Sequence, residues 1–175
     1  GKYSMGNKNK ITSREVDSKV IDLNSSESAG NRTVAIHFST EHNNQFCDFT
    51  DLLLHYVKES KVSNGSLNLY TPHTTTCFII NEAETGYIND FDSSIEEIVP
   101  SEKYYEHDDW DKRTENMQED EFKNGRSHVR ASIVGSTNVT IPIVDSELLL
   151  GRWQKIFFVE LDCSRDRRFF AQIIK

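Results

Sequence analysis

The sequence predicts an α+β fold, with a mixed, mostly antiparallel β-sheet and two main helices on one face. Short β-branched runs such as Thr33–Phe38 (TVAIHF) alternate in the way that strands do. Two longer segments, Asp51–Lys61 and Ala83–Val99, repeat apolar side chains at helical spacing. Histidines, carboxylates and hydroxyls stand at the ends of the predicted strands, which indicates that the domain carries a polar site.

Each element has a local reason. Asp48–Thr50 supplies N-cap residue types for the first helix, and Pro100 ends the second. Pro72 interrupts the β-pattern between two strands. A short helix is expected at His128–Val134. The expected strands are Lys19–Leu23, Thr33–Phe38, Ser66–Tyr70, Thr75–Ile80, Asn138–Val144 and Leu148–Leu150, followed by Gln154–Leu161 and Arg168–Ile174 as a closing antiparallel pair.

The length of 175 residues suits one domain. We expect residues 1–32 to form a polar N-terminal arm with the first strand, and residues 33–175 to form a single domain. Composition shifts sharply in the charged loop, residues 101–127, which includes the run HDDWDKRTENMQEDEF. A loop of this length is either functional or disordered. Because its ends lie beside two candidate histidines, we expect Asp108–Phe122 to be mobile and to cover a cleft.

The formal net charge is -8, with 28 acidic and 20 basic residues. This balance argues against salt-driven binding to nucleic acid or to an anionic membrane. Local basic groups, Arg126, Arg130 and Arg152–Lys155, could still hold a small anion. Neither a signal peptide nor an apolar run of membrane-spanning length is evident. Three cysteines without a CxxC pair indicate reduced thiols in the cytoplasm.

Three histidines are candidates for a site. His73 stands between Pro72 and three threonines, where it could bind a metal, carry a proton or simply complete a strand end. His128 begins the short helix, and His107 lies in the charged loop, where solvent exposure is the simpler interpretation. No HxH or HxxxH spacing links them, so the motif evidence for a metal is weak.

Other polar side chains could support phosphate or metal chemistry. Glu82 and Asp90 could share a helix face and hold a hard divalent cation through their oxygens. Arg130 could clamp phosphate, although an ion pair with a surface acid is the commoner fate of an arginine. The Trp153-Gln154 pair could floor a pocket or lie at a subunit interface. The common nucleotide and hydrolase signatures, such as the P-loop and GxSxG, are absent.

Three segments taken together, Leu69–Glu82, Asn124–Ser136 and Leu148–Asp162, resemble the YjbQ-like family of secondary thiamine-phosphate synthases. The HTT and INE motifs of that family fall on His73–Thr75 and Ile80–Glu82, and its LGTWQxIFxxExD motif falls on Leu150–Asp162. The family acid and histidine positions match Asp90, His107 and His128. Three departures are Arg152 in place of threonine, Cys163-Ser164 in place of Gly-Pro, and a longer interval between His107 and His128.

The resemblance implies a small α+β homotrimer whose polar residues face one cleft, and a small phosphorylated substrate. It implies a transferase that joins a pyrimidine diphosphate to a thiazole phosphate with release of pyrophosphate. A divalent metal, Mg²⁺ or Zn²⁺, would assist. The alternatives are a non-catalytic trimeric protein that binds a metal or an anion, and a metal-dependent phosphate-ester hydrolase. The expected residues are His73, His128, Glu82 and Arg130 for catalysis; His73, His107, His128 and Asp90 for metal; and Thr74, Thr75, Asn81, Asn124, Ser132, Trp153 and Gln154 for substrate.

Overall fold

The computed structural model describes residues 11–12, 16–24 and 31–175. The helices are α1 (Thr50–Ser60), α2 (Thr85–Ile98), α3 (Gly125–Val134) and the 3-10 turn η2 (Glu106–Asp108). The strands are β1 (Ile11–Thr12), β2 (Ser18–Asp22), β3 (Arg32–Ser39), β4 (Gln45–Asp48), β5 (Gly65–Tyr70), β6 (Thr76–Glu82), β7 (Asn138–Val144), β8 (Glu147–Leu148), β9 (Gln154–Glu160) and β10 (Asp166–Ile174).

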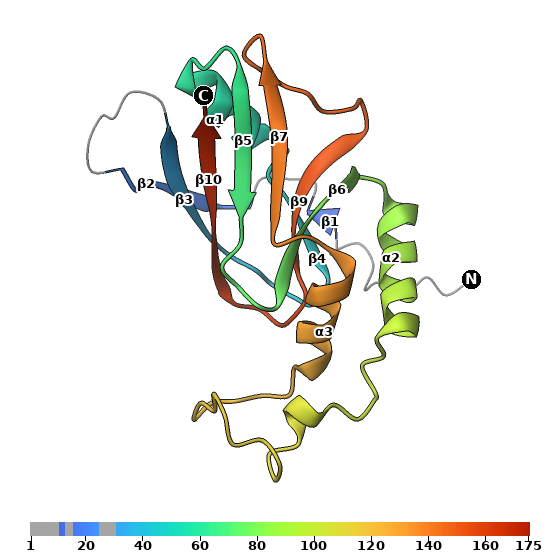
Figure 1. Ribbon diagram of the computed structural model, residues 1–175. Coiled ribbons are helices and arrows are strands. Elements are labelled where there is room, and N and C mark those ends of the chain that lie inside the picture. The colour runs from blue at the N-terminus through green and yellow to red at the C-terminus, as the bar shows by residue number, and fades with distance from the viewer. Residues whose placement is uncertain (1–10, 13–15, 25–30) are drawn as a thin grey trace.

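The strands divide between two sheets (Figure 1). One has six strands in the order β2-β3-β10-β5-β7-β8, and the other has four in the order β1-β4-β9-β6. The β1–β4 pair is parallel, and the remaining pairs between the described strands are antiparallel. The predicted class, an α+β fold with mixed and mostly antiparallel pairing, is therefore confirmed, although the strands form two sheets rather than one.

Phenylalanine side chains fill the space between the sheets. Phe158 of β9 and Phe169 of β10 stack with ring centroids 5.9 Å apart. Phe38 meets Phe158 edge to face at 4.9 Å, and Phe49 meets Phe169 in the same way at 4.9 Å. Such pairs add about 0.5–1.5 kcal/mol beyond the burial of their area. The two sheets are thus joined by an aromatic core.

The central strand β9 is covered on both faces, since successive strand residues point to opposite sides. Phe158 faces the core that includes Leu53 and Val57 of α1. Phe157 faces a second cluster that includes Ile88 of α2. The two main helices therefore pack against different faces of the four-stranded sheet, which differs from the expected arrangement on one face.

The strands β9 and β10 follow each other in sequence but do not pair. β9 pairs with β4 and β6, whereas β10 pairs with β3 and β5. The expected closing antiparallel pair is therefore wrong. β9 carries a continuous apolar run, Ile156–Val159, and the stacked Phe158 and Phe169 show that the two strands pack face to face across the core instead. The strand β4 was missing from the predicted elements because its four residues are too short to show a period.

A buried ion pair links the two sheets where β9 leads into β10. Arg167 donates from Nε and Nη2 to the two carboxylate oxygens of Glu160, over 2.7 and 2.6 Å. Glu160 is 0% exposed and Arg167 is 6% exposed. The Thr40 hydroxyl and the Asp162 backbone N–H also donate to the Glu160 carboxylate, over 2.7 and 3.0 Å. A charge buried to this degree requires such complete pairing.

None of the described cysteines forms a disulfide: Cys47 and Cys77 are buried, and Cys163 is exposed. Burial raises the pKa of the Cys77 thiol to about 12. This thiol is therefore protonated at neutral pH and is not a nucleophile. Among the described residues, no helix is long and apolar enough to cross a membrane.

The ion pair gives a stability prediction. Arg167→Met should lower the free energy of unfolding by about 3–5 kcal/mol, because it leaves the Glu160 carboxylate buried without its partner. The double variant Glu160→Leu/Arg167→Met should lose less than the sum of the two single changes. Urea denaturation measures each value. The exposed neighbour Arg168→Met serves as the control, with a change within about 0.5 kcal/mol. Additive losses would contradict the coupling.

Candidate functional site

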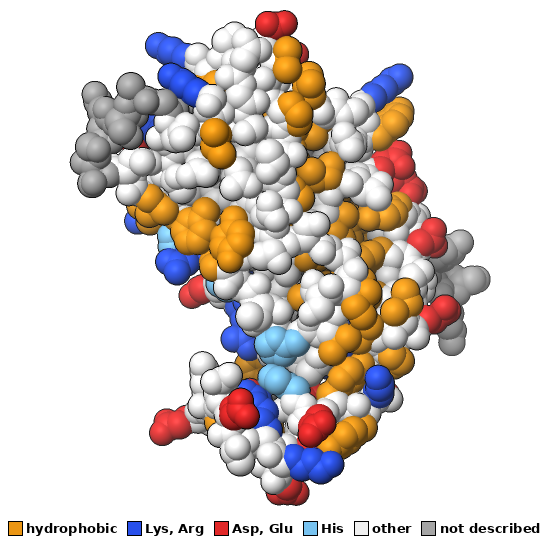
Figure 2. Space-filling model, viewed as in Figure 1, with side chains coloured by type: hydrophobic (Ala, Val, Ile, Leu, Met, Phe, Trp, Pro, Cys, Tyr) orange, Lys and Arg blue, Asp and Glu red, His pale blue; other side chains and the backbone are white. Residues whose placement is uncertain are grey.

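A cavity of about 820 Å³ lies at the end of the sheets, next to the charged loop. Four segments line it: the Pro72–Thr75 turn between β5 and β6, the charged loop, the start of α3 and the connection from β9 to β10. Figure 2 shows a recess between the body of the molecule and the charged loop, with histidine side chains (pale blue) beside it. The lining residues include all three predicted histidines, His73, His107 and His128.

His107 and His128 form a close pair, with ring centroids 4.5 Å apart and planes tilted by 48°. Their position depends on Asp108, which follows His107 in η2. The Oδ1 atom of Asp108 accepts hydrogen bonds from the backbone N–H groups of Asn124 and Gly125, both over 2.9 Å. An acid at this place satisfies free N–H groups of a helix start. It thereby fixes η2 against the first turn of α3, which carries His128.

Close contact at the same place explains why residue 125 is a glycine. A Cβ atom on Gly125 would lie 2.6 Å from the Cβ of Tyr105, closer than side chains approach one another. Any larger residue would push η2 away from α3. The Asn124-Gly125 sequence thus serves the spacing of the histidine pair.

The environment of His128 favours the neutral imidazole. Burial lowers its pKa most, and the His107 ring lowers it further, while Asp162 opposes both effects. With a pKa below the ordinary value of 6.5, His128 is uncharged at pH 7. A neutral imidazole has one donor and one acceptor nitrogen, so it can exchange protons with a bound substrate.

A second chain of polar contacts runs through the β9–β10 connection. The Nδ2 atom of Asn124 donates to Oδ2 of Asp162 over 2.9 Å, and Nη2 of Arg165 lies 3.1 Å from the same oxygen. The Arg165 guanidinium also lies over the Phe122 ring, 4.4 Å from its centroid. Asn124, a predicted substrate-binding residue, is therefore held in one orientation, and Arg165 brings a positive charge to the cavity.

His73 lies on the sheet side of the cavity, and a backbone contact fixes its tautomer. Its Nε2 atom accepts a hydrogen bond from the Arg168 N–H over 3.1 Å. Burial lowers the pKa of His73, and the nearby Arg167 charge lowers it further. Since a backbone N–H can donate only to an unprotonated nitrogen, the proton of the neutral ring resides on Nδ1. His73 is thus a hydrogen-bond donor here, and binding a metal would require this contact to break.

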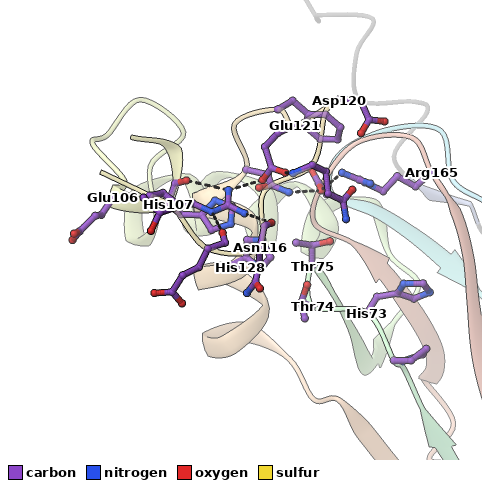
Figure 3. Close-up of a pocket in the computed structure, with 18 of the residues that line it drawn as sticks. His73, Thr74, Thr75, Glu106, His107, Asn116, Asp120, Glu121, His128 and Arg165 are labelled. Carbon is purple, nitrogen blue, oxygen red and sulfur yellow. Dashed lines mark hydrogen bonds and ion pairs between the residues drawn. The ribbon is translucent and has the colours of Figure 1, made fainter. Parts of the chain in front are cut away.

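The charged loop lies along the cavity, as expected for a segment that covers a cleft. Arg113 organises it, donating to the backbone oxygens of His107, Glu115 and Asn116 and to the carboxylate of Glu121. Figure 3 shows these loop residues facing the threonines of the Pro72–Thr75 turn across the cavity. The expected mobility of the loop stays a prediction.

Several predicted residues lie elsewhere. Asn81 and Glu82 end β6, seven residues or about 20 Å along the strand from the cavity. Glu82 pairs with Gln154 in the neighbouring strand, beside the exposed Trp153. The expected position at a strand end is right, but it is the end of β6 opposite the cavity. None of these four residues lines the cavity.

The remaining predicted residues also avoid the cavity. Arg130 is fully buried and donates to the Val99 carbonyl oxygen and to Glu96, which ties α3 to the end of α2. Asp90 is exposed on α2. The Ser132 hydroxyl donates to the backbone oxygen of His128 over 2.9 Å. Arg130 and Ser132 therefore serve the packing of α3, and neither is in position to touch a substrate in the cavity.

The side chains of one chain do not form the expected divalent-metal site. Across residues 16–24 and 31–175, no three His, Cys, Asp or Glu side chains gather as a metal-binding group. His73 has its acceptor nitrogen occupied, and Asp90 is remote from the histidine pair. Because these donors do not fit a divalent cation as they stand, no catalytic step is assigned to one.

Some cavity residues were not predicted from the sequence. Arg113, Asp162, Arg165 and Arg167 line the cavity and each hold another of its residues in place, and Asp108 does the same from beside it. A signal was present in the run RDRR, Arg165–Arg168, at the start of the last strand. Charged residues at a strand end are ambiguous on their own, and their partners come from distant segments.

Comparison with known proteins places this geometry in a family. The model of the UPF0047, YjbQ-like proteins matches residues 34–175. A UPF0047 protein of Methanothermobacter thermautotrophicus is 32% identical over 81% of this chain and 90% of its own, and one of Archaeoglobus fulgidus is 35% identical over 74% and 91%.

Solved structures agree with the sequence match. A hypothetical protein of Aeropyrum pernix aligns with a TM-score of 0.69 and 30% identity over 81% of this chain and 97% of its own. A YbjQ-like protein of unknown function from Sulfolobus solfataricus aligns with a TM-score of 0.67 and 26% identity over 82% and 98%. The matched residues, 34–175, run from β3 to β10 and include the charged loop and every segment that lines the cavity, and the chain belongs to the YjbQ-like, UPF0047 family.

Proposed function

We propose that the chain is a transferase of the thiamine-phosphate synthase type, acting on a small phosphorylated substrate in the histidine cavity. The single observation that supports this most is the meeting of the His107–His128 pair with His73, Thr75 and Arg165 around one space of about 820 Å³. That volume suits small organic ligands. The mixture of proton-exchanging rings, hydroxyls and a guanidinium suits a phosphate ester.

The reaction would form a bond between the thiazole nitrogen and the methylene carbon of the pyrimidine. The bond from that carbon to the diphosphate oxygen breaks, and pyrophosphate leaves with the electron pair. Arg165 and neutral histidine N–H groups would stabilise the charge that gathers on the leaving oxygens. The thiazole nitrogen becomes positive, and the acids Glu115 and Asp120 on the loop wall would favour that charge.

A non-catalytic anion-binding protein would use the same lining, so turnover must be measured rather than binding alone. A metal-dependent phosphate-ester hydrolase has less support, because the side chains of one chain do not gather a metal-binding group within the described residues. We propose a cytoplasmic location, and cysteines without a disulfide among the described residues are consistent with a reducing compartment.

We also propose that the chain assembles as a homotrimer, as the resemblance implies. Ile156–Phe158 do not support this, because those side chains are fully covered within one chain. Leu149 and Trp153 do, since they are 55% and 62% exposed close to one another in sequence. Exposed large apolar side chains of this kind are common at subunit interfaces.

The transferase proposal is tested first at His128. His128→Asn should lower the turnover of a pyrimidine diphosphate with a thiazole phosphate by about 100-fold or more, because it removes a proton-exchanging ring. Release of pyrophosphate and formation of thiamine phosphate are both measured. The matched control is His55→Asn on the exposed side of α1, which should keep full turnover. Absent turnover in the unaltered protein, with pyrophosphate bound, would favour the anion-binding alternative.

The histidine pair predicts a titration order. His128 should titrate below 6.5 by NMR, since burial and His107 both disfavour its protonated form. His107→Gln should raise the pKa of His128 but leave it below 6.5, because burial remains. Added pyrophosphate should raise it as well, since an anion stabilises the imidazolium. A His128 pKa unchanged by both would show that neither His107 nor the anion lies near its ring.

The trimer is tested by light scattering. The protein should have three times the chain mass of 20.2 kDa at micromolar concentration. Trp153→Ser should shift the distribution towards smaller species, because it removes an exposed indole from the proposed interface. Tyr104→Ser, on the charged loop, is the control and should leave the mass unchanged. A monomer mass for the unaltered protein would refute the proposal.

A further inference from the structure

The hydroxyl of Thr75 has its direction set by the buried ion pair. Nη2 of Arg167 donates to the Thr75 Oγ1 atom over 2.9 Å. Arg167 is itself held by two hydrogen bonds to Glu160. A threonine hydroxyl has one proton, and among the described residues no protein acceptor takes it. Thr75 is 5% exposed and lines the cavity, so that proton is left for a ligand.

His73 is also left as a hydrogen-bond donor, for an independent reason. Its acceptor nitrogen is filled by the Arg168 N–H, beyond the point where β5 stops pairing with β10 at Tyr70. The Nε2 atom of His73 therefore accepts the hydrogen bond that a neighbouring strand would otherwise take from Arg168. The ring proton consequently resides on Nδ1. Two neighbouring residues of β10, Arg167 and Arg168, thus make two side chains of the Pro72–Thr75 turn into donors.

From these contacts we infer that the Pro72–Thr75 turn is an oxyanion subsite, which binds the terminal phosphoryl group of the substrate through donors alone. This inference rests on the proposed function and assigns the place of the phosphate within it. Figure 3 shows His73, Thr74 and Thr75 on one side of the cavity and His107 and His128 on the other. The phosphate and the proton-exchanging pair therefore occupy opposite walls.

The chemistry of the subsite selects its ligand. The Arg167 charge is balanced by Glu160, so recognition here depends on hydrogen bonds rather than on net charge. A lining that offers donors favours a group with several acceptor oxygens, such as phosphate, and disfavours an amine or a metal cation. The nearby carboxylate of Asp162 accepts a hydrogen bond from Asn124 and is ion-paired with Arg165, so an anion meets these two charges as a pair.

Matched pairs of variants in the full chain test the subsite, with inorganic pyrophosphate as the probe and calorimetry as the readout. Thr75→Val should weaken binding by about tenfold or more, since it removes one hydrogen bond to a charged ligand. Thr75→Ser keeps the hydroxyl and should stay within about threefold of the unaltered protein. His73→Leu should weaken binding similarly, whereas His73→Gln, which can accept from Arg168 and still donate, should retain it. A chelator should leave binding unchanged.

Other outcomes separate this inference from the proposed function. Equal pyrophosphate affinity in Thr75→Val, Thr75→Ser and the unaltered protein would overturn the subsite even if turnover is observed. Loss of binding on chelation would also overturn it, because His73 would then act through a metal. Absence of turnover together with the predicted affinities would refute the transferase and leave the subsite in place. Circular dichroism confirms that each variant is folded before its affinity is compared.

Discussion

The buried pair between Glu160 and Arg167 constrains most of the structure around the cavity. It lies where β9 leaves one sheet and β10 enters the other, and both of its side chains are buried. Removing water from two charges costs several kcal/mol, and the bidentate contact between Arg167 and Glu160, with further hydrogen bonds from Thr40 and Asp162, offsets that cost. The pair thereby anchors the start of β10. From that anchored strand Arg168 sets the tautomer of His73, and Arg167 sets the direction of the Thr75 hydroxyl.

The other wall of the cavity is built differently. His107 and His128 come from segments that are irregular or only one short helix long, and their spacing depends on Asp108 and on the absence of a side chain at Gly125. One wall is thus fixed by the sheets and the other by a helix start. A ligand between them would contact a rigid donor surface on one side and a pair of titratable rings on the other.

The sequence carried the class of fold and nearly all of the elements, because alternation and helical spacing are local signals. The sequence did not show which strands belong to which of the two sheets. β9 and β10 look like a hairpin by their order, and only the packing of Phe158 on Phe169 shows that they face each other instead. The same limit applies to the site. The resemblance to the family motifs identified His73, His107 and His128 as site residues. It could not show that Glu82 and Arg130 lie away from the cavity, because that depends on which strand end and which helix face the cavity touches.

The anchoring of Asp108 on the first turn of α3 separates the ends of the charged loop from its interior. His107 and His128 are held relative to each other by the contacts of Asp108 with Asn124 and Gly125, and Arg113 adds a hydrogen bond to the His107 backbone oxygen. The parts of the intervening segment outside these contacts can therefore vary without moving the histidines. An acidic insertion of this kind can alter which molecules reach the rings while the rings themselves stay in register. The chain thus has one part whose residues are free to vary and another that keeps the two imidazole rings together.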